Sequence, residues 1–179
     1  MTMARLILVV LLAVLLPRVS FAQTTPRLRV LDSILRSTFE HGIAQSPTLR
    51  ELVAKIDLTS VLVFVDCELQ MPERIGAQLN FVTTVNGVRY VRVTIGCALA
   101  PRRQVALLAH ELQHALEIGE RPDITDVDTM ESFYDGTGFQ SFENGTHKGF
   151  ETDAALAIQQ RVEEEMGRRL SRSPEHSGD

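Results

Sequence analysis

Residues 107–119 read LLAHELQHALEIG, and their apolar spacing predicts an amphipathic helix that packs on a sheet. Proline is favoured in the first turn of a helix and glycine at its end, so the helix should run from Pro101 to Gly119. A face next to the apolar one carries His110, Glu111 and His114. The apolar face consists of Val105, Leu108, Leu112, Ala115 and Leu116.

The polar face of this helix has the spacing of a metal site. His110 and His114 are four residues apart, which places two imidazoles on one side of a helix, where they can converge on one ion. The segment matches the H-E-x-x-H pattern of zinc metallopeptidases, in which the glutamate is the general base. Zinc lowers the pKa of a bound water and polarises a carbonyl, and Glu111 is placed to take the proton. The competing interpretation is a solvated helix face with histidines in ordinary polar contacts.

With this motif the chain resembles the zincin metallopeptidases, and more narrowly the gluzincins, whose third zinc ligand is a glutamate on a later helix. The third histidine of the metzincins is absent after His114. The resemblance implies a small sheet above the active-site helix, one Zn²⁺ ion and a peptide or protein substrate. The chain lacks the second lobe of larger gluzincins. One wall of the cleft is therefore either missing or supplied by the glycine-rich loop expected at residues 136–149.

Glu151 is the third ligand that the resemblance favours. It opens an amphipathic segment that we expect to be helical to about residue 170. Glu131 lies in a short helix expected within residues 126–134, and His147 lies in the loop before Glu151. These two residues are the alternative ligands.

Two further roles in gluzincins lack a clear candidate here. Those enzymes place an aspartate one turn after the ligand to orient a histidine, whereas this chain has Ala155 at that turn and Asp153 two residues after the glutamate. The partner of the histidines is therefore open. Tyr90 and Tyr134 are the tyrosines of the chain, and either could be the oxyanion donor or a packing residue.

The remaining pattern predicts an α+β domain with a small antiparallel or mixed sheet, N-terminal helices and a long C-terminal helix. Residues 28–42 and 46–56 have helical spacing, with Gly42 as the stop of the first helix and Ser46 as the N-cap of the second. We expect at least three antiparallel strands between residues 61 and 95.

The clearest hairpin has Asn86-Gly87 at its turn, a dipeptide that favours type I′ geometry. If Val85 pairs with Val88, then Val82 lies opposite Val91.

The N-terminus predicts a secretory signal peptide over residues 1–22. Arg5 precedes an apolar run from Leu6 to Leu16, which is too short to span a bilayer core of roughly 30 Å. The mature domain should extend over residues 23–170, followed by a disordered tail at 171–179. We therefore expect a periplasmic or extracellular protein whose mature chain is not stably inserted in a membrane.

Export favours a disulfide between Cys67 and Cys97, each of which follows a predicted strand. Two free buried thiols are the alternative.

The net charge of −5, with mixed signs and no basic stripe, argues against nucleic acid as a partner.

The sequence thus predicts an exported zinc metallopeptidase with His110, His114 and Glu151 as ligands and Glu111 as base. Two other hypotheses compete with it. One is an exported zinc-binding domain without proteolytic activity that binds a partner or an envelope component, and the other is a metal-free structural domain.

Overall fold

The computed structural model describes residues 26–71, 75–144 and 147–168. The predicted signal peptide and the predicted disordered tail lie outside these ranges. Within them the fold is α+β, as expected, and the main sheet is mixed. Its four strands lie in the spatial order β1 (Leu28–Val30), β2 (Val61–Glu68), β4 (Val88–Gly96) and β3 (Ala77–Val85).

The direction of β2 differs from the prediction. β2 pairs with β4 in parallel, from Val61 opposite Arg89 to Glu68 opposite Gly96, and β1 is parallel to β2. Only the β3–β4 pair is antiparallel among the described strands of this sheet. The expectation of three antiparallel strands is therefore wrong. The chain leaves β2, passes β4 to form the edge strand β3, and returns through the hairpin, so β4 runs alongside β2 in the same direction.

The β3–β4 hairpin turns at Asn86-Gly87, where both residues have positive φ, 51° and 75°, as a type I′ turn requires. The register next to the turn is as predicted, but a bulge follows at Val82. Phe81 takes the expected place of Val82 opposite Val91. The bulge leaves Val82 57% exposed and keeps Phe81 in the core.

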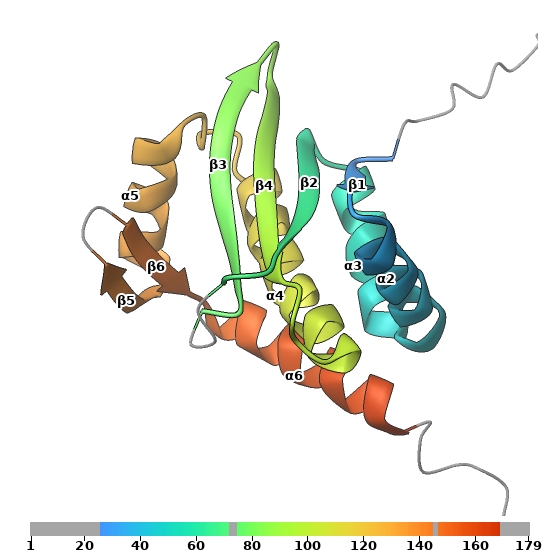
Figure 1. The fold of residues 1–179 in the computed structure, drawn as a ribbon. Coiled ribbons are helices and arrows are strands. Elements are labelled where there is room, and N and C mark those ends of the chain that lie inside the picture. The colour runs from blue at the N-terminus through green and yellow to red at the C-terminus, as the bar shows by residue number, and fades with distance from the viewer. Residues whose placement is uncertain (1–25, 72–74, 145–146, 169–179) are drawn as a thin grey trace, which may run out of the picture.

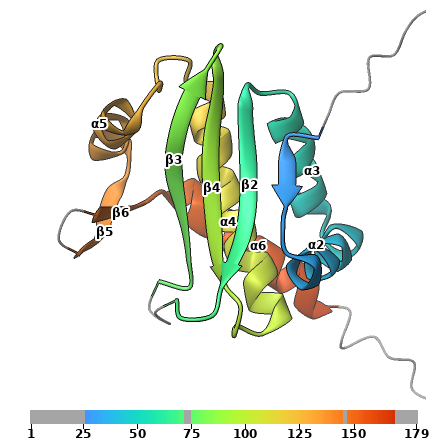
Figure 2. The same ribbon diagram turned by 45° about the horizontal axis from the view of Figure 1, so that its top comes forward.

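Four helices, α2, α3, α4 and α6, gather on one face of the sheet, and α5 lies beside its β3 edge (Figures 1 and 2). α4 lies directly against the strands, and α2, α3 and α6 pack on α4 from its other sides. None of the helices in the described part of the chain is long and apolar enough to span a membrane. The helices are α2 (Ser33–Gln45), α3 (Pro47–Asp57), α4 (Pro101–Glu120), α5 (Val127–Thr137) and α6 (Asp153–Arg168).

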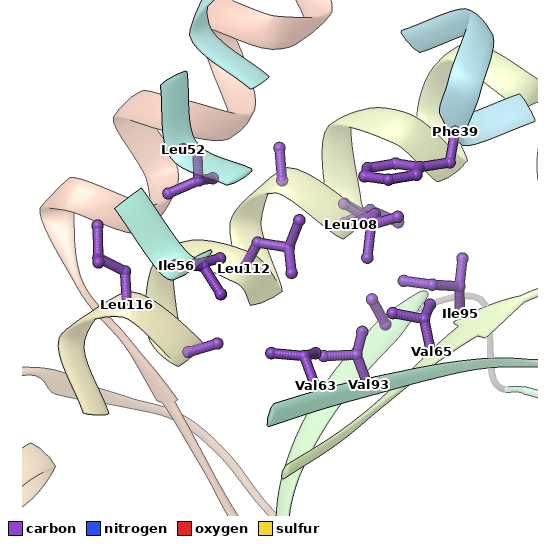
Figure 3. Packing of buried hydrophobic residues seen from close by; sticks show 14 of the residues in the cluster. Phe39, Leu52, Ile56, Val63, Val65, Val93, Ile95, Leu108, Leu112 and Leu116 are labelled. Atoms are coloured by element: carbon purple, nitrogen blue, oxygen red, sulfur yellow. The ribbon is translucent and has the colours of Figure 1, made fainter. Parts of the chain in front are cut away.

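The core is built around α4 (Figure 3). Leu108 and Leu112 of α4 are fully buried, with Val63 and Val93 of the sheet on one side and Ile56 of α3 on another. Full burial of such a side chain contributes about 1.5–3 kcal/mol. The helix that carries the histidine motif is therefore fixed in place by packing on several sides.

The N-terminal segment differs from the predicted helix. Residues 28–30 form β1, and α2 begins only after Asp32, whose carboxylate accepts a hydrogen bond from the Leu35 N–H at 2.7 Å. α2 also continues past Gly42 to Gln45. A Cβ at Gly42 would lie 2.6 Å from Cγ1 of Val105, so this glycine permits close packing of α2 on α4 and does not end the helix.

Ser46 caps α3 as predicted, and it also contacts α6. Its hydroxyl accepts from the Leu49 N–H and donates to Glu165 Oε2 at 2.6 Å, while the Thr48 hydroxyl donates to Glu165 Oε1 at 2.8 Å. Burial raises the pKa of Glu165, but the hydrogen bonds from Ser46 and Thr48 outweigh it and hold that pKa below its ordinary value.

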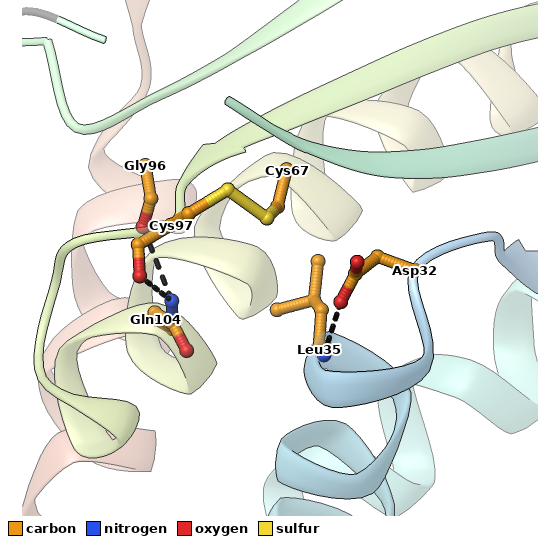
Figure 4. The surroundings of a disulfide bond; sticks show 6 residues. All are labelled: Asp32, Leu35, Cys67, Gly96, Cys97 and Gln104. Carbon is orange, nitrogen blue, oxygen red and sulfur yellow. Dashed lines mark hydrogen bonds between the residues drawn. A yellow bond between two sulfur atoms is a disulfide. The ribbon is translucent and has the colours of Figure 1, made fainter. Parts of the chain in front are cut away.

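A disulfide joins Cys67 to Cys97, with their Cα atoms 5.2 Å apart (Figure 4). Because β2 and β4 are parallel neighbours, their carboxyl ends lie side by side, and each cysteine lies at one of these ends. Gln104 of α4 donates to the carbonyls of Gly96 and Cys97 at 3.1 Å each. The bridge thus lies where the sheet leads into α4.

Candidate metal centre

Three potential metal ligands meet where α4 passes the end of a second, two-stranded sheet. His110 and His114 come from α4 and are 5% exposed, and Glu151 is half-buried. Nε2 of His110 lies 3.2 Å from Nε2 of His114 and 3.0 Å from Oε2 of Glu151. One donor atom from each of the three residues falls within 4.8 Å of the others. The structure therefore brings together the three residues that the sequence named as ligands.

Glu151 reaches this position from a strand and not from a helix. It is the last residue of β6 (His147–Glu151), which pairs with β5 (Phe139–Asn144), and α6 begins at Asp153. The predicted helix start at Glu151 is therefore wrong by two residues. Pairing with β5 extends β6 through Glu151, and Thr152, which accepts a hydrogen bond from the Ala155 N–H, caps α6.

The β5–β6 hairpin replaces the glycine-rich loop that the sequence predicted at residues 136–149. Gly138 precedes the hairpin, and a Cβ there would lie 2.6 Å from the carbonyl oxygen of Glu151. A glycine at this position therefore lets the chain pass close to the third ligand. Gly149 and Phe150 of β6 line the cavity beside the three ligands, so this segment supplies part of its wall.

The cavity measures about 350 Å³, within the usual range for ligand sites. One side of the cavity is formed by α4, with His110, Glu111 and His114. Other sides are formed by the edge of β3 and one face of α5. Glu131 lines the cavity but is not part of the ligand cluster. The side chain of His147 lies outside the described part of the structure. The residues that β3 and α5 contribute are Ala77, Gln78, Leu79, Asn80, Phe81, Val127, Met130, Glu131 and Tyr134.

Glu111 is 6% exposed and faces the same cavity. Burial raises the pKa of Glu111, while the nearby His114 and His110 and a hydrogen bond from the Leu79 backbone lower it by less. For His110, burial lowers the pKa, but Glu151 and the other neighbouring carboxylates outweigh burial and raise it above its ordinary value. Burial thus favours the neutral form of Glu111, and the carboxylates around His110 favour the charged form of its imidazole.

The donor atoms fit a cation. Glu151 Oε2 is buried and, although it lies 3.0 Å from His110 Nε2, the approach does not have hydrogen-bond geometry, so this oxygen has no hydrogen-bond partner among the described residues. Ligands held about 2.0–2.2 Å from a tetrahedral zinc ion are about 3.3–3.6 Å from one another. The separations of 3.2 and 3.0 Å are close to these values.

The sequence analysis did not identify Glu117, which contacts His114. Its Oε2 lies 2.9 Å from His114 Nδ1, on the side of the ring away from the ligand cluster. Glu117 follows His114 by three residues on the same helix, so the i, i+3 spacing could have revealed it. His110 has no such partner, because its buried Nδ1 makes no hydrogen bond to any described residue. This agrees with the presence of Ala155 where gluzincins have an aspartate.

The two tyrosines have different surroundings. Tyr90 stacks on Phe64 at 6.5 Å between ring centroids and does not line the cavity. Tyr134 packs its ring edge against His114 at 5.4 Å, and its hydroxyl lies 3.2 Å from Glu117 Oε2 and 3.3 Å from the His114 carbonyl oxygen. Tyr134 is thus engaged with the groups behind His114.

Comparison with protein-family models, with curated proteins and with solved structures finds no significant match to this chain. The resemblance to gluzincins therefore rests on the motif residues and their arrangement alone.

Proposed function

We propose that this chain is an exported zinc metallopeptidase of a small, gluzincin-like type. The observation that carries the proposal is the convergence of His110, His114 and Glu151 in one cavity with Glu111. Two histidines and a glutamate are the protein ligands of several catalytic zinc sites, in which a further coordination position stays open for chemistry.

His110, His114 and Glu151 would hold the ion, which as a Lewis acid polarises the substrate carbonyl and promotes deprotonation of water. Glu111 lies on the same helix turn as His110 and faces the same cavity. Its role is to accept the proton of the attacking water and to deliver it to the amine that leaves.

The edge of β3 supports an extended peptide as the substrate. Within the described residues β3 pairs with β4 alone, and Gln78, Leu79 and Asn80 on its other edge line the cavity. An unpaired strand edge binds an extended peptide through backbone hydrogen bonds, and on this edge the Leu79 backbone already donates to Glu111. Such binding would place a peptide bond beside the ligand cluster largely independently of sequence, and apolar residues such as Met130 would contact its side chains.

The proposal is tested on the mature chain beginning at Gln23. Metal analysis should find one zinc per chain, and a fluorogenic peptide library should be hydrolysed. Glu111→Gln should keep the zinc and the fold but lower kcat/KM by several orders of magnitude, because base and metal act as a unit. Glu131→Gln is the matched control, since Glu131 lines the same cavity outside the ligand cluster, and it should keep most of the activity.

Each outcome selects one hypothesis. Zinc without turnover on any peptide favours the non-proteolytic zinc-binding domain, and the absence of zinc in protein refolded with excess metal favours the metal-free domain. Turnover that survives in Glu111→Gln contradicts the proposed base. N-terminal sequencing of protein recovered outside the cytoplasm tests export, which predicts Gln23 as the first residue.

A further inference from the structure

Glu117 lies behind the candidate metal centre and accepts from four groups. Its Oε2 faces His114 Nδ1 at 2.9 Å and the Tyr134 hydroxyl at 3.2 Å. Its Oε1 accepts from the Thr152 hydroxyl at 2.8 Å and, more weakly, from the Gln113 amide at 3.4 Å. An ionised carboxylate has about four acceptor sites and no donor. Glu117 therefore accepts from His114, Thr152 and Gln113, and it shares the single proton of the Tyr134 hydroxyl with the His114 carbonyl oxygen.

This arrangement fixes the proton position on one imidazole. Because the Glu117 carboxylate can only accept, its contact with His114 places the ring proton on Nδ1. The lone pair of a neutral His114 is then on Nε2, the atom that faces His110 and Glu151. A carboxylate behind a histidine ligand has this effect in metal sites generally.

Glu117 also holds the segment that carries the third ligand. Thr152 directly follows Glu151, and its hydroxyl donates to Glu117 while it accepts from the Ala155 N–H. These two bonds fix the point where β6 ends and α6 begins. One carboxylate on α4 is thereby connected to His114 on its own helix and to Glu151 through the adjacent residue.

We propose that Glu117 is a positioning residue that orients two metal ligands from distant parts of the chain, His114 directly and Glu151 through Thr152. The inference rests on the proposed metal site, which it extends to the groups that orient it. His110 serves as an internal reference, because its Nδ1 has no hydrogen-bond partner in the described structure. The same protein thus contains one histidine that should be orientated by a carboxylate and one that should not.

The first test uses metal-free protein, so that it is independent of the proposed activity. ¹⁵N NMR of the imidazoles distinguishes a ring protonated at Nδ1 from one protonated at Nε2. At a pH where the rings are neutral, His114 of the unaltered protein should be the Nδ1–H tautomer, and Glu117→Ala should shift it towards Nε2–H. In Glu117→Ala the imidazole ¹⁵N signals of His110 should change less than those of His114. Glu117→Leu, which keeps much of the size of the side chain but has no acceptor, repeats the test if the alanine variant does not fold.

The second test measures zinc affinity by competition with a chelator. Loss of a group that orients a metal ligand usually costs 10–100-fold in affinity, and Glu117→Ala should fall in this range. Thr152→Val should also weaken zinc binding, and Thr152→Ser, which keeps the hydroxyl, should restore it. Because Glu117 and Thr152 act through one shared hydrogen bond, the fold-loss of zinc affinity in the double variant should be smaller than the product of the fold-losses in the two single variants. Ser132→Ala, which removes an exposed hydroxyl of α5 outside these contacts, is the control and should bind zinc normally.

The results decide between the two proposals separately. An Nε2–H tautomer at His114 in the unaltered protein, or zinc affinity that is unchanged in both Glu117→Ala and Glu117→Leu, would overturn the role of Glu117. Independent effects of Glu117 and Thr152 would overturn the connection to Glu151. If the unaltered protein binds no zinc, the proposed function fails, while the tautomer of His114 still shows whether Glu117 orients the ring.

Discussion

Removal of the disulfide between Cys67 and Cys97 should cost a large part of the stability of the domain. The two residues are separated by 30 positions in the sequence. In the chain-entropy description, a crosslink that closes a loop of this length lowers the entropy of the unfolded chain by an amount worth roughly 3.5 kcal/mol at 25 °C. Typical domains have a total stability of about 5–15 kcal/mol, so this is a substantial fraction.

The folded state should change little when the bridge is removed. β2 and β4 form eight consecutive parallel pairs, one of which contains Cys67, and this pairing holds the strand ends together without the crosslink. A Cα separation of 5.2 Å is within the usual range for disulfides, so the bridge does not require the backbone to move. The predicted loss therefore comes mainly from the unfolded state.

The assay is urea unfolding of metal-depleted protein, followed by circular dichroism. It compares the oxidised protein, the reduced protein, Cys67→Ala, Cys97→Ala and the double variant. With a urea dependence of about 1–3 kcal/mol per M, the loss corresponds to a midpoint lower by roughly 1–3 M. Either single variant should lose nearly as much as the double variant, because each one removes the whole crosslink.

A loss below about 1 kcal/mol in the double variant would refute this reasoning, since the crosslink would then not restrict the unfolded chain as calculated. Single variants that differ strongly from each other would show that packing of the individual sulfur atoms, and not the crosslink, determines the effect.

Three further predictions concern single residues. Glu151→Ala should greatly weaken zinc binding and abolish the rise in melting temperature that zinc produces, whereas Glu131→Ala should retain both. Calorimetric titration measures the two zinc affinities, and loss of binding in Glu131→Ala with retention in Glu151→Ala would make Glu131 the third ligand. Gly42→Ala places a methyl group 2.6 Å from Cγ1 of Val105. This overlap should cost about 1–3 kcal/mol, more than the roughly 1 kcal/mol that alanine gains in helix propensity, and a rise in thermal stability would contradict it. Glu165→Gln should destabilise the protein at neutral pH, because a carboxyl group whose pKa is lowered by folding contributes stability above its ordinary pKa. This contribution is lost as the pH falls through the folded pKa, so the stabilities of variant and unaltered protein should converge between pH 7 and 3. A constant difference in stability over this range would contradict the linkage.

The local signals in the sequence predicted the elements that depend on local interactions. Asn86-Gly87 specified its turn, Ser46 and Pro47 specified the start of α3, and the limits of α4 lie within one residue of those expected from Pro101 and Gly119. Caps and turns act within a few residues, so a single sequence contains the information needed to place them.

The predictions that failed depend on contacts between distant segments. β1 has only three residues and is a strand because it pairs with β2, which no local pattern reveals. The direction of β2 relative to β4 is a matter of chain topology. Gly42 has the appearance of a helix stop, but its role depends on the approach of Val105 from another helix.

In the candidate site, too, the features that depend on local spacing were predictable and those that depend on distant contacts were not. The spacing of His110 and His114 on one helix was visible in the sequence, and so was the spacing of Glu117, although it was not recognised. The strand conformation of Glu151 was not visible, because it depends on the pairing of β6 with β5. The hydrogen bond from Thr152 to Glu117 joins segments whose proximity exists only in the folded protein.

The origin of the ligands on two separate segments determines when the site can come into existence. The two histidines converge only when α4 has formed, and Glu151 joins them only when β6 lies beside that helix. A polypeptide that crosses a membrane as an unfolded thread would therefore arrive at its destination without its metal. If the protein is exported and binds zinc as proposed, metal loading would follow folding outside the cytoplasm and would depend on the zinc available there.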